Sequence, residues 1–160
     1  MGNGLGMMLG GSNYFFPSRW VSLGGIDGEA AGDESGWSVS LSSDGTIVAI
    51  GAPSNDGNGS NSGHVRVYQN LSGTWTQVGA DIDGEAAGDL SGVSVSLSDD
   101  GSILAIGASY NNGSGIIAGH VRVYENIAGS WSQIGSDIDG EADYDESGRS
   151  VSLSADGTIV

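Results

Sequence analysis

Residues 94–108, with the sequence SVSLSDDGSILAIGA, contain two short runs that differ in their pattern of apolar residues. The first run alternates with a period of two, which predicts a strand over 94–98. The second run is apolar on both sides, which predicts a strand over 102–108 in a sheet that is covered on both faces. Asp99-Asp100-Gly101 between them is typical of a tight turn. The stretch therefore predicts an antiparallel hairpin inside a buried sheet.

Two further strands are predicted downstream of this hairpin. A loop of Asn, Gly and Ser over 109–119 leads to HVRVYE at 120–125, and a turn at 127–129 leads to SWSQI at 130–134. Both segments are rich in β-branched and aromatic residues and are bounded by turn residues. We therefore expect four antiparallel strands in this part of the chain.

The same pattern occurs 56 residues earlier. Residues 26–74 and 82–130 are identical at 33 of 49 positions without a gap, and a third copy runs from Ile138 to Val160. In the first copy the predicted strands are 38–42, 46–52, 64–69 and 74–78. A fixed period of this size indicates that each copy is one supersecondary unit that packs against its neighbours.

We expect an all-β fold of β-propeller blades, each built from four antiparallel strands of the 56-residue repeat. Small Ser residues suit a crowded inner strand, while Trp75 and Trp131 suit a wide outer strand. A stack of sheets without closure and a β-helix are the alternatives, although a β-helix coil is normally much shorter. Because the third copy stops within a predicted strand, we expect an incomplete, open propeller from a longer array.

The predicted divisions of the chain follow from this repeat. They are a non-repeat segment at 1–19, an outer strand and connection at 20–37, a first blade at 38–79, a second connection and blade at 80–135, and a partial third copy at 136–160. The segment 1–19 lacks the basic and apolar regions of a secretory signal.

The composition narrows the classes of partner. The chain has 20 acidic and 4 basic residues and a formal net charge of −16. Such a charge repels nucleic-acid phosphates and anionic lipids, so neither nucleic acid nor membrane insertion is expected. The apolar runs are much shorter than a membrane span. The absence of Cys excludes disulfides and thiolate metal sites.

Three segments of the first copy resemble the FG-GAP repeat of integrin-α-type β-propellers. They are GWSVS at 36–40, IVAIGAP at 47–53 and GHVRVY at 63–68, with Trp37, Val93 and Arg149 at the position of the motif's Phe. The sequence is also similar to repeats in large secreted proteins of marine bacteria. The resemblance implies an extracellular or cell-surface propeller used for adhesion or ligand binding. The calcium loop of the family is shortened here to Asp-Gly turns, so no calcium site is expected there.

Acidic residues recur instead in the connection between the fourth strand and the next first strand. Oxygen ligands at alternating positions around a glycine suit Ca²⁺, whereas the alternative is a solvated acidic turn whose side chains cap their own backbone. The candidate Ca²⁺ ligands are Asp27, Glu29, Asp33, Asp81, Asp83, Glu85, Asp89, Asp137, Asp139, Glu141 and Asp145.

Other side chains are weaker candidates. The loops between the second and third strands supply candidate ligand-binding residues, namely Asn55, Asp56, Asn58, Asn111 and Asn112. For His64 and His120 a structural hydrogen-bonding role is favoured over metal binding. Arg66 and Arg122 are expected to pair with an acidic residue of a neighbouring blade.

No catalytic motif is recognisable, and the acidic residues recur in each copy as scaffold residues would, so we expect no enzyme. The leading hypothesis is an extracellular or cell-surface binding or adhesion module for a protein or glycan ligand, which also contacts neighbouring repeats of a longer chain. A glycan-binding propeller and a structural spacer in a large surface protein are the alternatives.

Overall fold

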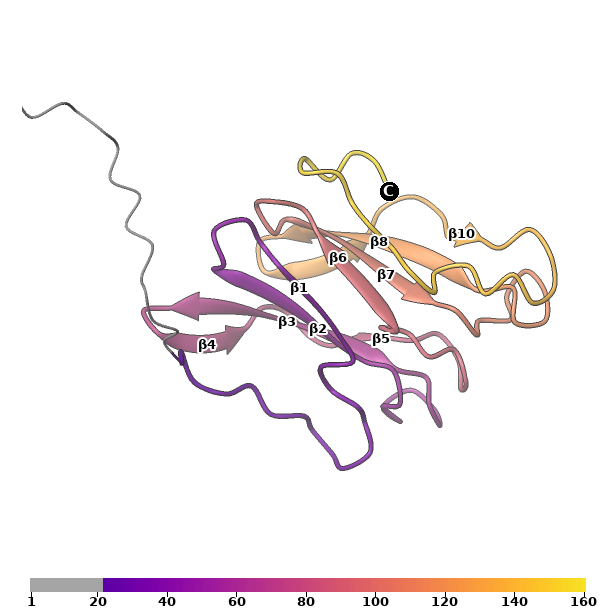
Figure 1. The fold of residues 1–160 in the computed structure, drawn as a ribbon, viewed down its shortest axis with the longest axis horizontal. Helices are drawn as coiled ribbons and strands as arrows, with labels where there is room; N and C mark the ends of the chain where they lie inside the picture. Colours follow the sequence, from indigo (N-terminus) through magenta and orange to yellow (C-terminus); the bar gives the residue numbers. More distant parts are fainter. Residues whose placement is uncertain (1–21) are drawn as a thin grey trace, which may run out of the picture.

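The computed structural model describes residues 22–160, and this part of the chain contains ten β-strands and no helix (Figure 1). The non-repeat segment at 1–19 and the outer strand expected around Trp20 lie outside the described residues. The strands are arranged in two separate antiparallel sheets, each built from one complete copy of the repeat and the first two residues of the next copy. The predicted all-β fold is confirmed.

The first sheet has the strand order β1-β2-β3-β4, with β5 beside β3. Its strands are β1 Ser38–Leu41, β2 Ile47–Ala52, β3 His64–Leu71, β4 Thr74–Gln77 and β5 Ile82–Asp83. The second sheet repeats this order with β6 Ser94–Leu97, β7 Ile103–Ala108, β8 His120–Ile127, β9 Ser130–Gln133 and β10 Ile138–Asp139. The eight predicted strands are confirmed, with bounds that move by one or two residues.

The two shortest strands, β5 and β10, correct the prediction of four strands per sheet. The chain leaves the sheet after Gln77 and returns five residues later, where Ile82 pairs with Val65 and Asp83 pairs with His64. The outer edge of each sheet is therefore made by two short segments. This second segment carries the start of the acidic connection along the end of β3.

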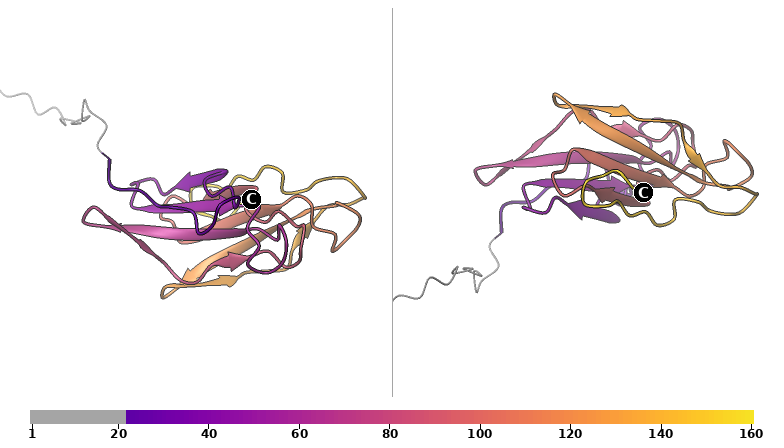
Figure 2. Two further views of the ribbon diagram at one scale, coloured as in Figure 1. Left: turned by 90° about the horizontal axis from the view of Figure 1, so that it is seen from below. Right: turned by 90° about the horizontal axis from the view of Figure 1, so that it is seen from above.

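The two sheets pack face to face, and Figure 2 shows β3 and β8 in different layers. The core between them contains Ala49, Val65, Val67 and Ile82 from the first sheet and Leu97, Leu104, Ile106 and Tyr124 from the second. Burial of one large apolar side chain contributes about 1.5–3 kcal/mol. Face-to-face packing of successive sheets, without closure into a barrel, is consistent with part of an open propeller.

The Ser residues of the inner strands join consecutive copies. Ser38 Oγ donates to the Gly92 carbonyl oxygen at 2.7 Å, and the Leu97 amide donates to Ser40 Oγ at 2.9 Å. Ser94 and Ser96 make the same two bonds to the third copy, with Gly148 and Leu153. The small size of these serines was predicted to suit a crowded inner strand. The structure adds that their hydroxyls connect one inner strand to the copy that follows.

Candidate functional site

The two kinds of loop expected to carry function lie side by side at one edge of the molecule. The acidic connection at 84–93 runs along the Asn-rich loop at 53–63, and the amides of Gly88, Leu90 and Ser91 donate to the carbonyls of Ser60, Asn61 and Ser62 at 2.9, 3.2 and 3.0 Å. The connection at 140–148 contacts the loop at 109–119 in the same way. Backbone hydrogen bonds therefore fix this edge in both copies.

Asp89 and Asn111 stabilise this edge from inside. Asp89 is 1% exposed, and its Oδ2 accepts hydrogen bonds from Asn111 Nδ2 at 2.9 Å and from the Ala86 amide at 3.0 Å. Asp33 and Asn55 make the same pair in the first copy, also at 2.9 Å. These residues were candidates for cation and ligand binding, and the structure places them inside the loops, where they hold each other.

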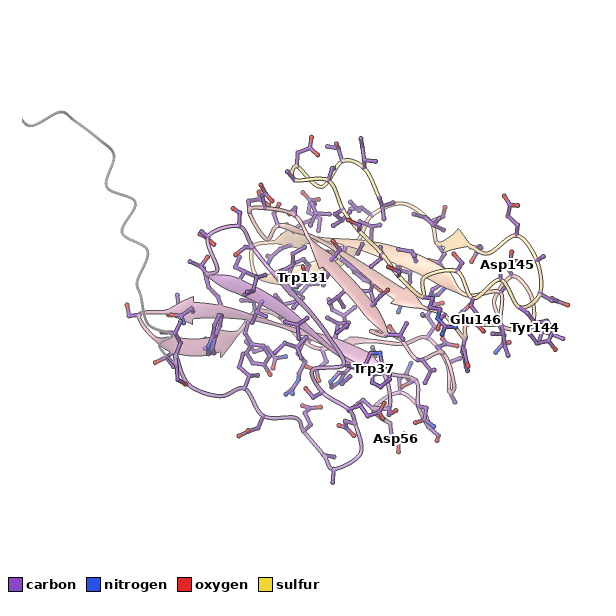
Figure 3. The ribbon with its side chains drawn as sticks, viewed as in Figure 1. Trp37, Asp56, Trp131, Tyr144, Asp145 and Glu146 are labelled. Carbon is purple, nitrogen blue, oxygen red and sulfur yellow. The ribbon has the colours of Figure 1, made fainter. Side chains whose placement is uncertain are left out.

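The other candidates of the Asn-rich loops also bind backbone groups. Asn58 Nδ2 donates to the Gly84 carbonyl at 2.7 Å, Asp56 accepts from the Asn61 amide at 2.8 Å, and Asn112 accepts from the Ile117 amide at 2.8 Å. Asp145 accepts from the Ala142 amide at 2.7 Å. Figure 3 shows Asp56 and Asp145 at this loop edge. Most of the predicted loop residues therefore shape the loops that carry them.

Two groups of metal-ligand side chains converge within the described part of the chain, one in each complete copy. They are Glu29, His64 and Asp81, and Glu85, His120 and Asp137. In the second group, His120 Nδ1 lies 3.5 Å from Asp137 Oδ2 and 4.0 Å from Glu85 Oε2. The structure thus combines acidic residues from two successive connections with the His that begins the third strand. Asp27, Asp83, Asp139 and Glu141 belong to neither group.

His120 does not have the structural hydrogen-bonding role expected from the sequence. Its side chain is 1% exposed, its Nε2 has no hydrogen-bond partner, and its Nδ1 faces the two carboxylates at 3.5 and 4.0 Å without forming a hydrogen bond to either. Burial, followed by the nearby charge of Arg122, lowers the pKa of His120 below its ordinary value of 6.5. The imidazole is therefore neutral near pH 7.

Arg122 joins the acidic connection to the second sheet. Its Nη2 donates to the Asp83 carbonyl at 2.8 Å, and its Nη1 lies 3.6 Å from Glu85 Oε1. The guanidinium also lies over the Tyr124 ring, 5.6 Å from the ring centre. Arg66 makes the equivalent contacts with Asp27, Glu29 and Tyr68. Both arginines thus pair with an acidic residue, as expected, but this residue lies in the connection that precedes the same blade.

A surface pocket of about 270 Å³ lies at the same loop edge. Its lining residues are Trp37, Leu90, Val93, Ser109, Tyr110, Glu146 and Arg149. Trp37, which is labelled in Figure 3, is 62% exposed and Tyr110 is 42% exposed, so both residues are accessible. Sequence reasoning missed this pocket, although Trp37, Val93 and Arg149 occupy the same position in three copies, and this equivalence was the available signal.

The comparisons with known proteins concern the repeat itself. The chain has no match among the curated proteins. In the described residues, no helix is long and apolar enough to cross a membrane. FG-GAP repeats form a non-catalytic repeat and binding fold that usually occurs in extracellular proteins. Residues 26–68, which lie in the first copy, match the model of the FG-GAP repeat, and this match supports the resemblance of the chain to an FG-GAP-like repeat family.

Proposed function

We propose that this chain is an extracellular or cell-surface binding module that uses its loop edge to hold a protein or glycan ligand. The observation that carries the proposal is the pocket beside Trp37, which opens among loops fixed by backbone hydrogen bonds and by the buried Asp89–Asn111 pair. A rigid concave site that combines exposed rings with a few polar groups is typical of ligand recognition. The recurrence of the same acids in each copy favours binding over catalysis.

A glycan is the better supported of the two ligand classes. Trp37 and Tyr110 offer aromatic faces on which a sugar ring stacks. Glu146 and Arg149 form an ion pair with each other at the pocket wall, and the remaining guanidinium N–H groups and carboxylate oxygen can still bind sugar hydroxyls. Trp75 and Trp131 are less suitable, because both are half-buried and Trp131 Nε1 donates to the Val78 carbonyl at 3.0 Å. The favoured sugar-binding aromatics are therefore those of the pocket.

The test is a glycan array followed by titration of the best glycan with two variants. Trp37→Ala should weaken binding at least tenfold, because it removes a stacking surface that is largely exposed and contributes little to the core. Tyr144→Ser is the matched control, since Tyr144 is 65% exposed at the loop edge but does not line the pocket. Absence of binding to any glycan by the folded chain would favour a protein ligand or the structural-spacer alternative.

Neighbouring repeats are the second partner that we propose. Leu41 is 56% exposed, whereas its equivalent Leu97 is 8% exposed because the first sheet covers it. The surface around Leu41 is thus the one on which a preceding copy would pack. This equivalence supports a role within a longer array.

Calcium stays a prediction for the acidic connections. The exposed carboxylates of Asp83, Asp139 and Glu141 supply oxygen ligands, but Asp89 is already hydrogen-bonded to Asn111. Because Ca²⁺ takes six to eight oxygens, we expect a weak site that raises Tm only at millimolar Ca²⁺. An unchanged Tm together with no saturable heat of binding would contradict this expectation.

A further inference from the structure

We propose that each complete copy of the repeat holds one divalent transition-metal ion of the zinc class between its Glu, its His and its last Asp. The two sites are Glu29, His64 and Asp81, and Glu85, His120 and Asp137. This inference goes beyond the proposed function and does not depend on it.

The spacing of the donor atoms suits such an ion. The nitrogen and the carboxylate oxygens of each site lie within 4.8 Å of one another, and in the second site His120 Nδ1 is 3.5 and 4.0 Å from Asp137 and Glu85. Around a tetrahedral ion with bonds of about 2.0–2.1 Å, donor atoms lie about 3.4 Å apart. The His120–Glu85 distance of 4.0 Å exceeds this value, and small rotations of the Glu85 side chain, which is 47% exposed, would shorten it.

The buried imidazole is a second, independent indication of a ligand. His120 is almost fully buried, yet its Nδ1 is directed at two carboxylate oxygens without a hydrogen bond to either of them. An imidazole that is buried without polar partners is costly unless something binds it.

In the second site, the carboxylate oxygens of Asp137 and Glu85 that face away from His120 are contacted by side chains outside the site. Gln133 Nε2 donates to Asp137 Oδ1 at 2.7 Å, which leaves Oδ2 facing His120, and Arg122 lies against Glu85 Oε1, which leaves Oε2 facing the same ring. Gln77 and Arg66 hold Asp81 and Glu29 in the same way in the first copy. Such outer contacts are what orient metal ligands in proteins.

The donor set selects the class of ion. One imidazole nitrogen with two carboxylates suits zinc and related ions, whereas Ca²⁺ prefers six to eight oxygen ligands. The Glu85 side chain is 47% exposed and the Asp137 side chain is 29% exposed, so the site is open to solvent on one side and a water can complete the coordination. Ca²⁺ should therefore not compete effectively with zinc here.

Equilibrium dialysis and calorimetric titration of the whole chain with Zn²⁺ near pH 7.5 test the proposal. The wild-type chain should bind two ions, and the double variant Glu85→Gln, Asp137→Asn should bind one, with its fold checked by circular dichroism. Glu125→Gln is the matched control, because Glu125 is exposed on β8 and belongs to neither site. It should still bind two ions.

Long-range ¹H–¹⁵N NMR of the imidazoles locates the ion independently of the variants. Zn²⁺ should shift the His120 Nδ1 resonance while Nε2 carries the proton. The proposal is overturned by absence of saturable Zn²⁺ binding, by an unchanged stoichiometry in the double variant, or by equal competition from Ca²⁺. Binding of two ions without a shift at His120 Nδ1 would also overturn it.

Discussion

At the scale of single residues, one Asp in each tight turn explains why these turns are hairpins and not cation loops. Asp100 Oδ1 accepts hydrogen bonds from the Ser102 amide at 2.9 Å and from the hydroxyls of Ser102 and Ser98, both at 2.8 Å. These contacts, the Ser102 amide first, hold the pKa of Asp100 below its ordinary value of 3.8. Asp44 makes the same contacts with Thr46 and Ser42. One oxygen of each carboxylate is thus engaged by its own turn.

This arrangement predicts how stability depends on pH. Because the folded pKa of Asp100 lies below the unfolded value, its contribution is present above about pH 4 and is lost as the pH falls through the folded pKa. Asp100→Asn should therefore lower stability at neutral pH and flatten its decline between about pH 5 and pH 2. Urea unfolding across this range measures the effect. Asp99→Asn, which removes the neighbouring exposed charge, should keep the wild-type slope.

At the scale of elements, the strands could be predicted and the path between them could not. Alternation over 94–98 and the apolar run over 102–108 fix strands because the pattern is local. The two-residue strand β5 has no pattern of its own, and it forms only because β3 supplies the partners Val65 and His64. The hydrogen bond of Asp89 could not be predicted for a similar reason, since its partner Asn111 lies 22 residues away. The same spacing of Asp33 and Asn55 was the available signal.

The Asp89–Asn111 hydrogen bond, which joins the acidic connection at 84–93 to the loop at 109–119, should be essential to the stability of the loop edge. Asp89→Ala leaves the buried side-chain amide of Asn111 without its acceptor, which costs about 1–3 kcal/mol. It also removes the acceptor of the Ala86 N–H, but Ala86 is exposed and water can replace that bond. We expect a matching fall in the free energy of unfolding measured with urea. Asp139→Ala removes an exposed carboxylate of the next connection and should change the free energy of unfolding by less than about 0.5 kcal/mol. Equal losses in the two variants would contradict a structural role specific to Asp89.

At the scale of the whole molecule, the sites arise from segments that the repeat brings together. Glu85, His120 and Asp137 are far apart in the sequence, and they meet because the connection from the first sheet crosses the start of β8 while the chain before β10 lies beside it. Hydropathy and spacing contain no information about this crossing. The repeat explains why the two groups are alike, because each is formed by residues at equivalent positions of its copy.

Each connection also approaches the backbone of the preceding sheet closely, at Gly107 and at Gly51. A Cβ added at Gly107 in β7 would overlap the carbonyl oxygen of Gly148, and Gly51 meets Gly92 in the same way. Those carbonyls are the acceptors of Ser94 and Ser38, so the glycines make room for the bonds that join consecutive copies. A side chain at Gly107 would push the Gly148 carbonyl away from Ser94 and so separate β6 from the connection at 140–148.

Gly107→Ala should therefore destabilise the packing of successive copies by about 1–3 kcal/mol or more, because a rigid backbone oxygen cannot move aside as a flexible side chain would. Urea unfolding measures the loss, and amide exchange should show weaker protection of the Gly92 N–H, which donates to the Gly107 carbonyl at 3.0 Å. Gly25→Ala is the control, since a Cβ there meets nothing within 4 Å. Wild-type stability in the Gly107 variant would show that the copies tolerate separation, and that their docking rests on the apolar core alone.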